Sequence, residues 1–238
     1  MSTEENFIDF KCPYCGELVS YPQDAIGFAR ECFNCLESFI VPEAGTEAGK
    51  RIPVPIATPR LVLRRFNASD WKGLMELLSD DEFLGYTDGL QGEGEDQVLH
   101  WLESDHHIKL TSPDQTFRLA IELKDGGKLI GFLGLRLAGQ VQAELRINLH
   151  RNFQRQGFAL EALDALLGFC FEGINLHRVY AGCDSRNAPA CRLFEKAGLR
   201  REGLFLKNEF ANGEWTDTAY YALLREEYRD TDGGRTNS

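Results

Sequence analysis

Four of the seven cysteines lie near the N-terminus in two pairs with the same internal spacing, and a segment with this pattern has few ways to fold. The first pair is Cys12 and Cys15, the second is Cys32 and Cys35, and sixteen residues separate the pairs. Two C-x2-C turns of this kind bring four thiolates around one tetrahedral ion, which makes the pattern a strong signal for zinc. We therefore predict that these four cysteines bind one Zn²⁺.

This zinc ion is predicted to be structural. Four thiolate ligands leave no coordination position for the water molecule that a catalytic zinc needs. About forty residues bury too little apolar surface to fold alone, so the metal would supply the missing free energy of folding. Short strands are predicted at 18–21, 28–30 and 38–41, and the segment resembles a zinc ribbon. Disulfides or redox-active pairs are the alternative, which a reducing compartment and the lack of a βαβ pattern disfavour.

The charge of the chain narrows the classes of partner. The sequence holds 26 Lys and Arg against 37 Asp and Glu, a formal net charge of −11. No concentrated basic patch interrupts this excess, so we expect binding neither to nucleic acid nor to a membrane. A cationic substrate would be attracted, although solubility alone also accounts for an acidic chain. No apolar run approaches the roughly 20 residues that span a bilayer, and residues 1–10 do not resemble a signal peptide, so we expect a cytoplasmic protein.

The chain is predicted to divide into a small module and a large domain. Residues 1–42 form the zinc-ribbon-like module, and the polar, glycine-bearing and proline-bearing stretch 43–57 is predicted to be a linker. Residues 58–228 form the large domain, and 229–238 are predicted to be a flexible tail. Residues 1–57 carry four basic and nine acidic side chains, so we expect the module to dock on the large domain or on a protein partner.

From Thr58 onward the apolar pattern alternates between a period of two and a period of 3.6 residues. The predicted elements are a strand at 60–66, a helix from about 71, a helix at 93–106, strands at 116–123, 128–137 and 142–149, a helix at 157–172, a strand at 177–183, a helix at 187–197 and a final hairpin that turns at 212–213. This order predicts a mixed α/β domain, in which antiparallel hairpins flank one parallel pair joined by the long helix.

The turn that opens the long helix is the most informative stretch. Its residues are Gln154, Arg155, Gln156, Gly157, Phe158 and Ala159. Successive backbone N–H groups and the positive end of a helix form an anion site suited to a pyrophosphate. Gly157 lets the backbone approach phosphate oxygens, Ala159 leaves room in the first turn, and Arg155 adds charge. Taken alone, this short pattern also fits any strand-to-helix turn.

In this order of elements, the Q-x-x-G-x-A turn resembles the GNAT superfamily of N-acetyltransferases, whose pyrophosphate loop is Q/R-x-x-G-x-G/A. The resemblance covers about residues 58–228 and is closest to the branch that acetylates the N-terminal alanine or serine of ribosomal proteins. The matching stretches are Thr58-Pro-Arg-Leu-Val-Leu-Arg, Ala143-Glu-Leu, Arg186-Asn187, Leu193-Phe-Glu-Lys-Ala-Gly198 and Asn212-Gly-Glu-Trp-Thr-Asp217. It implies a mixed sheet of about six or seven strands flanked by helices, beside the small zinc ribbon.

The resemblance also implies a chemistry. A neutral amine would attack the thioester carbonyl of acetyl-CoA within a ternary complex. The strands at 142–149 and 177–183 would splay apart, and the pantetheine arm would take backbone hydrogen bonds at Ile147, Asn148 and Leu149. One of these N–H groups would polarise the thioester oxygen. Asn187 matches the family asparagine that contacts this arm, although its position as a helix cap also accounts for it.

Proton transfer is the least determined part of the predicted site. Glu144 is the first candidate for the base because the related branch has a glutamate thirteen residues before the loop glycine, and a solvated strand residue is an equal alternative. His150 is a second candidate, or it only lines the cleft. The chain has Phe194 where many relatives have a tyrosine that protonates the leaving thiolate. It also has Ala190 where the branch often has a serine.

Two functions follow. The first is an N-acetyltransferase for a primary amine, either a protein or peptide N-terminus or a small molecule. The second is a non-catalytic acyl-CoA-binding module whose zinc ribbon recruits a partner. Phe194 and Ala190 slightly favour the second, while the intact loop and Glu144 favour the first. A homodimer is the default expectation for the assembly.

Overall fold

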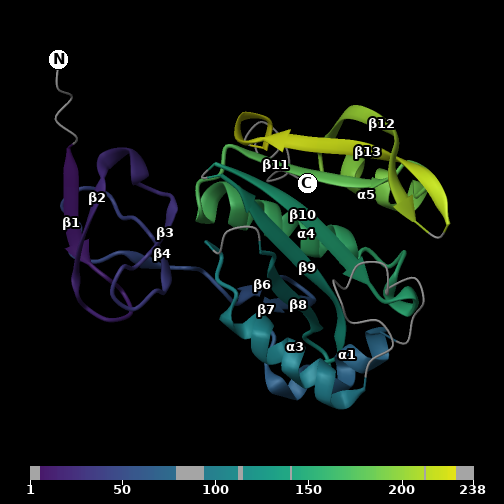
Figure 1. The fold of residues 1–238 in the computed structure, drawn as a ribbon, viewed down its shortest axis with the longest axis horizontal. Coiled ribbons are helices and arrows are strands. Elements are labelled where there is room, and N and C mark those ends of the chain that lie inside the picture. The colour runs from purple at the N-terminus through teal and green to yellow at the C-terminus, as the bar shows by residue number, and fades with distance from the viewer. Residues whose placement is uncertain (1–5, 79–93, 112–114, 140, 212, 229–238) are drawn as a thin grey trace.

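The computed structural model describes residues 6–78, 94–111, 115–139, 141–211 and 213–228, which form a small N-terminal module beside a large α/β domain (Figure 1). The predicted tail at 229–238 lies outside the described residues. Among the described residues, no helix combines the length and the apolar character that crossing a membrane requires.

The N-terminal module consists of two small antiparallel sheets. Its elements are β1 (Phe7–Lys11), β2 (Leu18–Pro22), the 3-10 turn η1 (Gln23–Ala25), β3 (Ala29–Glu31), β4 (Ser38–Ile40) and β5 (Lys50–Arg51). β1 pairs with β2, and β4 lies between β3 and β5. Alternate residues of β1 and β2 point inward. The rings of Phe10, Tyr21 and Phe39 meet there with centroids 5.5, 5.7 and 5.9 Å apart.

The large domain is built on one eight-stranded sheet. Its strands are β6 (Ile56–Ala57), β7 (Leu61–Arg64), β8 (Phe117–Leu123), β9 (Leu129–Ala138), β10 (Gln142–Leu149), β11 (Arg178–Asp184), β12 (Arg200–Ala211) and β13 (Glu214–Leu224). Their order across the sheet is β12-β13-β11-β10-β9-β8-β7-β6. Of the pairs in the described sheet, β10 with β11 is parallel and the others are antiparallel.

This architecture agrees with the predicted mixed α/β fold, with one more strand than expected. The additional strand, β6, belongs to the stretch that composition indicates as a linker, and β5 comes from the same stretch. β5 pairs with β4 in one of the two sheets of the N-terminal module, and β6 adds to the edge of the main sheet. Short edge strands form through backbone hydrogen bonds to a neighbour, and a composition rich in glycine and proline does not reveal such a neighbour.

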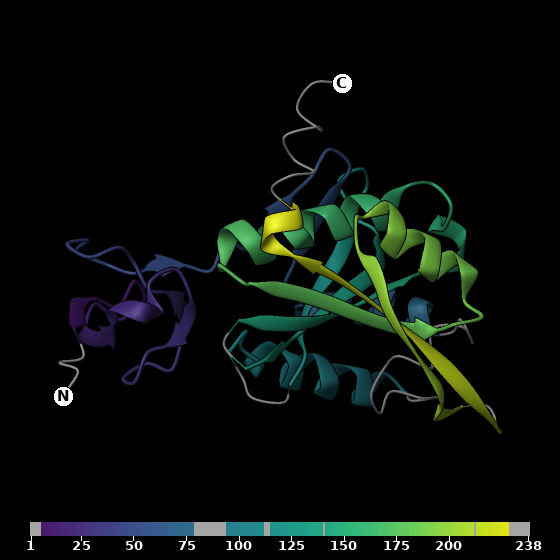
Figure 2. The same cartoon turned by 90° about the horizontal axis from the view of Figure 1, so that it is seen from above.

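Helices cover both faces of the main sheet, as Figure 2 shows. These elements are the 3-10 turn η2 (Ala68–Asp70), α1 (Trp71–Leu78), α3 (Glu95–His107), the 3-10 turn η3 (Arg151–Phe153), α4 (Phe158–Gly168), the π-helical turn η4 (Phe169–Gly173) and α5 (Ala188–Lys196). Asn67 and Asp70 form a capping box at the first turn, with Asn67 as the cap. Asn187 caps α5, as predicted.

The main sheet separates two hydrophobic cores, one on each of its faces. One core packs α4 and α5 against the sheet and includes Leu145, Leu163 and Leu166. The other packs α1 and α3 against the opposite face and includes Leu74 and Val98. Because side chains alternate along a strand, Leu145 faces the α4 side while its neighbours on β10 face the α3 side. Polar side chains of β10 are thereby placed on the α3 face of the sheet.

The N-terminal module packs directly on the large domain. Ile40 of β4 belongs to the large hydrophobic core, and the Ser38 and Thr111 hydroxyl oxygens lie 2.8 Å apart. Lys109, just after α3, donates to the carbonyl of Leu36 and lies 3.5 Å from the Glu37 carboxylate. Of the two docking possibilities that the charge left open, the structure shows contact with the chain's own large domain.

Candidate active site

The two parallel strands of the sheet separate part-way along their length. β10 and β11 pair at Gln142 with Arg178, and the pairing ends at Glu144 with Tyr180. Beyond this point β10 remains bonded to β9 as far as Leu149, and β11 remains bonded to β13. Within the described register, the later residues of β10 have no strand partner on the β11 side. A backbone edge inside a sheet is thus available to an extended ligand.

A tight turn follows at the open end of β10. The side chain of Gln154 donates to the carbonyl of Leu149 at 3.0 Å, and that of Gln156 donates to the carbonyl of Asn152 at 2.8 Å. Arg155 has a φ of 59°, and Gly157 has a φ of 84° and caps α4. These left-handed residues fold the chain back on itself before the helix begins.

The turn presents backbone donors at the start of α4. The first helical hydrogen bond runs from the Glu161 amide to the Gly157 carbonyl at 3.0 Å. The amides of Phe158, Ala159 and Leu160 therefore precede the helical ladder. Together with the helix dipole they favour a negative charge at this end. The fit to a diphosphate thus rests on backbone geometry, beside the open edge of β10.

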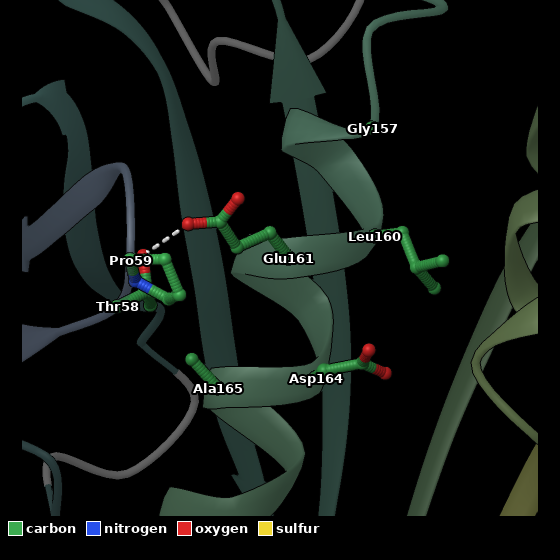
Figure 3. Close-up of a pocket in the computed structure, with 7 residues that line it drawn as sticks. All are labelled: Thr58, Pro59, Gly157, Leu160, Glu161, Asp164 and Ala165. Carbon is green, nitrogen blue, oxygen red and sulfur yellow. Dashed lines mark hydrogen bonds between the residues drawn. The ribbon is translucent and has the colours of Figure 1, made fainter. Parts of the chain in front are cut away.

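Arg60, which sequence analysis did not assign to the site, lies against this turn. Its Nε lies 2.6 Å from a Glu161 carboxylate oxygen, and its Nη1 donates to the Gln156 carbonyl at 3.0 Å. Thr58 donates to the same carboxylate at 2.6 Å. Figure 3 shows the hydrogen bond that joins Thr58 to Glu161. Both residues line a cavity of about 510 Å³, together with Pro59, Gly157, Leu160, Asp164 and Ala165. The sequence does contain a signal for Arg60, because the Thr58-Pro-Arg stretch matches the family. The match alone gives this arginine no role.

Glu144 lies on the α3 face of the sheet where β10 and β11 part. Its carboxylate forms ion pairs with Arg136 and with Arg146, the latter at 3.6 Å, and its side chain is 16% exposed. The candidate base is therefore neither isolated nor fully solvated. Arg136 comes from the neighbouring strand, directly opposite Glu144 in the register, which only the strand pairing reveals.

Tyr220 adds a phenol to the same face. It lies opposite Gly182 in the register, and a Cβ on that glycine would be 3.3 Å from the tyrosine ring. The ring therefore lies over β11, where a side chain would block it. Burial, and then the negative charge of Glu144, raise the pKa of Tyr220. Tyr220 was not among the predicted site residues, because its approach to Glu144 depends on a third strand.

The other predicted residues differ in their burial and in their hydrogen bonds. His150 caps the 3-10 turn η3 and accepts from the Asn152 amide at 3.3 Å, which gives it a local structural role. Asn148 is buried, and its side-chain nitrogen has no hydrogen-bond partner among the described residues. Asn187 accepts from the Ala190 amide at 3.0 Å. Phe194 is buried.

The four N-terminal cysteines come together, although they lie in two separate turns. Their sulfur atoms all lie within 4.8 Å of one another, with Cys12 and Cys35 3.7 Å apart and Cys15 and Cys32 3.8 Å apart. A tetrahedron with Zn–S bonds of about 2.3 Å has edges of about 3.8 Å. The backbone amide of Glu17, followed by the side chain of Asn34, lowers the pKa of Cys15 to about 7. The donor set fits a tetrathiolate zinc ion.

Comparison with known proteins agrees with this geometry. The family model described as an acetyltransferase (GNAT) domain matches residues 60–200. The chain belongs to the GNAT family. Members of this family use acetyl-CoA as the acetyl donor, and the chain is an acetyl-CoA-dependent N-acetyltransferase. The open edge of β10 and the turn before α4 lie inside the matched region.

Individual relatives extend over most of the GNAT domain. The uncharacterized N-acetyltransferase YnaD of Bacillus subtilis (strain 168) is 33% identical over 175 residues, which cover 73% of this chain and 98% of YnaD. A GNAT-family acetyltransferase structure from Bacillus anthracis has a TM-score of 0.63 and 29% identity, and covers 72% of this chain and 98% of its own.

One solved structure that resembles this fold holds ligands. The spermidine N-acetyltransferase from Vibrio cholerae, in complex with CoA and spermine, has a TM-score of 0.61 and 24% identity. The match covers 71% of this chain and 98% of that protein. At this identity the likeness shows the fold of the GNAT domain alone.

Proposed function

We propose that this GNAT enzyme transfers the acetyl group of acetyl-CoA directly to a primary amine within a ternary complex. The observation that carries the proposal is the parting of β10 and β11 beside the left-handed turn that opens α4. The open strand edge suits the pantetheine arm, and the turn suits the diphosphate. In the reaction, the amine nitrogen forms a bond to the acetyl carbon, the C–S bond breaks, and CoA leaves as a thiolate.

The backbone supplies most of the proposed acetyl-CoA site. The β10 backbone at Ile147–Leu149 would bind the pantetheine arm, and the turn at Gln154–Ala159 would bind the diphosphate. An amide of β10 would stabilise the oxyanion that forms at the acetyl carbonyl. Asn187 would contact the arm through the part of its side chain that does not cap α5. Holding both reactants in line accounts for most of the acceleration.

Glu144 is the proposed base. It would remove the proton of the incoming ammonium, directly or through water, from the α3 face of the parted strands. The ion pairs with Arg136 and Arg146 fix the orientation of its carboxylate. Phe194 offers no proton donor for the departing thiolate. This is a modest demand, because a thiol with a pKa near 8.5 leaves readily as a thiolate near neutral pH.

The acceptor is proposed to be a primary amine that is cationic before it reacts. The chain carries a formal net charge of −11, which attracts such a group. The Vibrio cholerae enzyme was solved with spermine, a ligand of that protein. Polyamines are therefore the first small amines to test with this chain. Peptides that begin with alanine or serine are the matching test of the ribosomal-protein branch.

The N-terminal cysteines are proposed to bind one structural zinc ion. Cys12, Cys15, Cys32 and Cys35 would complete its coordination, so the ion takes no part in acetyl transfer. Its role is to hold a small module that packs on the large domain through Ile40.

Calorimetric titration of the zinc-loaded protein with acetyl-CoA, and with CoA for comparison, tests the proposal. We expect micromolar or tighter binding that Gly157→Glu reduces, because a carboxylate would enter the anion site. Release of free CoA is then measured with spermidine, with Ala-peptides and Ser-peptides, and with no amine. Amine-dependent release identifies the acceptor class. Absence of acetyl-CoA binding would remove the proposed site, and binding without release for any amine would favour the non-catalytic alternative.

A further inference from the structure

A compact group of contacts joins the start of the main sheet to the start of α4. Glu161 is at its centre and accepts from three donors: the Thr58 hydroxyl at 2.6 Å, the Arg60 amide at 2.8 Å and the Arg60 Nε at 2.6 Å. Its side chain is 14% exposed, whereas that of Arg60 is 47% exposed. A surface ion pair contributes little by itself, but several donors on one half-buried carboxylate hold their geometry.

The second arm of the guanidinium reaches the turn itself. Nη1 of Arg60 donates to the Gln156 carbonyl at 3.0 Å, while the guanidinium carbon lies 4.3 Å from the centre of the Phe158 ring. A Cβ at Gly157 would lie 3.2 Å from Nη2 of Arg60. One planar group thus contacts Gln156 and Phe158 and lies beside the position that a side chain at Gly157 would take. The Nε side of the same guanidinium is held by the Glu161 carboxylate.

The contact with Gln156 has a consequence for the next amide. The peptide bond between Gln156 and Gly157 is trans, so its carbonyl and its N–H point in opposite directions. A carbonyl bonded to Arg60 therefore directs the Gly157 N–H away from Arg60. A hydrogen bond to the carbonyl oxygen also polarises the peptide and makes its N–H a stronger donor.

We propose that Arg60 is a positioning residue for the diphosphate of acetyl-CoA, acting through the Gln156–Gly157 peptide. Thr58 and Glu161 hold the guanidinium, the guanidinium holds the Gln156 carbonyl, and the amides at the start of α4 face the bound phosphates. The proposal rests on the proposed acetyl-CoA site. It gives a function to the Thr-Pro-Arg stretch, which lies about a hundred residues before the turn in the sequence.

Titration of acetyl-CoA into Arg60→Ala tests this role. We expect the Kd for acetyl-CoA to rise about 10-fold, the loss typical of one charge-assisted hydrogen bond. In steady-state assays, most of the loss appears in the KM for acetyl-CoA, and the KM for the amine changes little. A purely structural loss would lower the fraction of folded enzyme and leave both KM values unchanged.

Three further variants sharpen the test. Arg60→Lys keeps the charge beside Glu161 but lacks the planar fork, so we expect it to fold and still to show most of the loss in affinity. Glu161→Gln should weaken binding less. Combined with Arg60→Ala it should add nothing, because Glu161 acts through Arg60. Arg200→Ala is the matched control, since Arg200 is 46% exposed and paired with Glu202 away from the turn.

The outcomes separate this proposal from the one on which it rests. Wild-type affinity in Arg60→Ala, or full recovery in Arg60→Lys, would overturn the positioning role while the acetyl-CoA site stands. An additive loss in the double variant would also overturn it. If the wild-type protein itself fails to bind acetyl-CoA, the proposed site is lost and the positioning role with it.

Discussion

At the scale of single residues, the α3 face of the parted strands carries more charge than the sequence pattern suggested. Glu144 lies between Arg136 and Arg146, and burial together with its charge raises the pKa of nearby Tyr220. Because both arginines hold the Glu144 carboxylate in one orientation, an amine must approach it from one side to give up a proton. Its pairing also means that replacing Glu144 takes one carboxylate away from both Arg136 and Arg146, which any variant must take into account.

The first prediction concerns Glu144→Gln. Loss of the base should lower kcat at least ~10-fold, with acetyl-CoA affinity nearly unchanged, because the side chain lies away from the diphosphate turn. Turnover is followed by CoA release across pH, and affinity by calorimetry.

Glu202→Gln serves as the matched control for this variant. Glu202 is also paired with two arginines, Arg178 and Arg200, but near the start of β12. Loss of turnover in both variants would indicate a general effect of broken ion pairs. An unchanged pH profile in Glu144→Gln would remove Glu144 from the role of base.

At the scale of elements, the start of α4 depends on backbone conformations that most residues avoid. Gly157 has a φ of 84° as the cap of the helix, and Arg155 adopts a φ of 59° with a side chain. The helix then gains a carboxylate in its first turn, Glu161, which joins it to Thr58 in the turn between β6 and β7. Local strain and a long-range contact together define the turn.

Gly157→Ala should weaken both stability and binding. A left-handed alanine costs about 1–2 kcal/mol, and its Cβ would lie 3.2 Å from Arg60. We expect a matching loss in the free energy of unfolding, measured with urea, and weaker binding of acetyl-CoA. Gly126→Ala provides the control, since Gly126 has a φ of 78° with no atom near its Cβ position. Equal loss of affinity in both variants would show that the turn has no special role.

The pH dependence of stability should report the carboxylate of Glu161. Partial burial opposes its charge, but hydrogen bonds from Thr58 and Arg60 outweigh this and hold its pKa below the ordinary 4.5. A carboxylate with a depressed pKa stabilises the fold above its unfolded pKa, and this contribution is lost as the pH falls through the folded pKa. Wild type should therefore melt above Glu161→Gln near pH 7, and the difference should shrink below about pH 4.5. A difference that stays constant down to pH 3 would contradict this assignment.

At the scale of the whole molecule, the N-terminal module packs against the surface of the large domain. Ile40 lies in the large core, and Lys109 binds the carbonyl of Leu36, the residue after a predicted zinc ligand. The stretch between the two parts adds β5 to one sheet of the module and β6 to the main sheet. Changes at the cysteine cluster should therefore reach the domain that carries the proposed acetyl-CoA site.

Removal of zinc should destabilise both parts. We expect one zinc per chain by metal analysis, and we expect Cys32→Ser or a chelator to unfold the module. Melting of the large domain should then fall by several degrees, because each lost kcal/mol shifts Tm by about 2–4 °C in a domain of this size. Cys191→Ser, outside the cluster, should retain the zinc. A folded module without metal would contradict the zinc assignment.

Local patterns in the sequence determined much of this protein. The spacing of Cys12 and its partners, the switch between periods of two and 3.6, and the turn at Gly157 each act over a few residues. They predicted the thiol cluster and the α/β order, and they place the proposed anion-binding turn at the start of the long helix. The family resemblance added the parting of the strands and named Glu144 and Asn187, whose roles stay predictions.

Only the tertiary structure decided which distant residues meet. Strand pairing placed Arg136 opposite Glu144, and a glycine on β11 let Tyr220 reach across it. The edge strand β6 and the contact between Arg60 and Gln156 join segments whose local patterns carry no sign of each other. Side-chain periodicity reports which face of an element is buried, but not which neighbour it meets, because that depends on the register between elements.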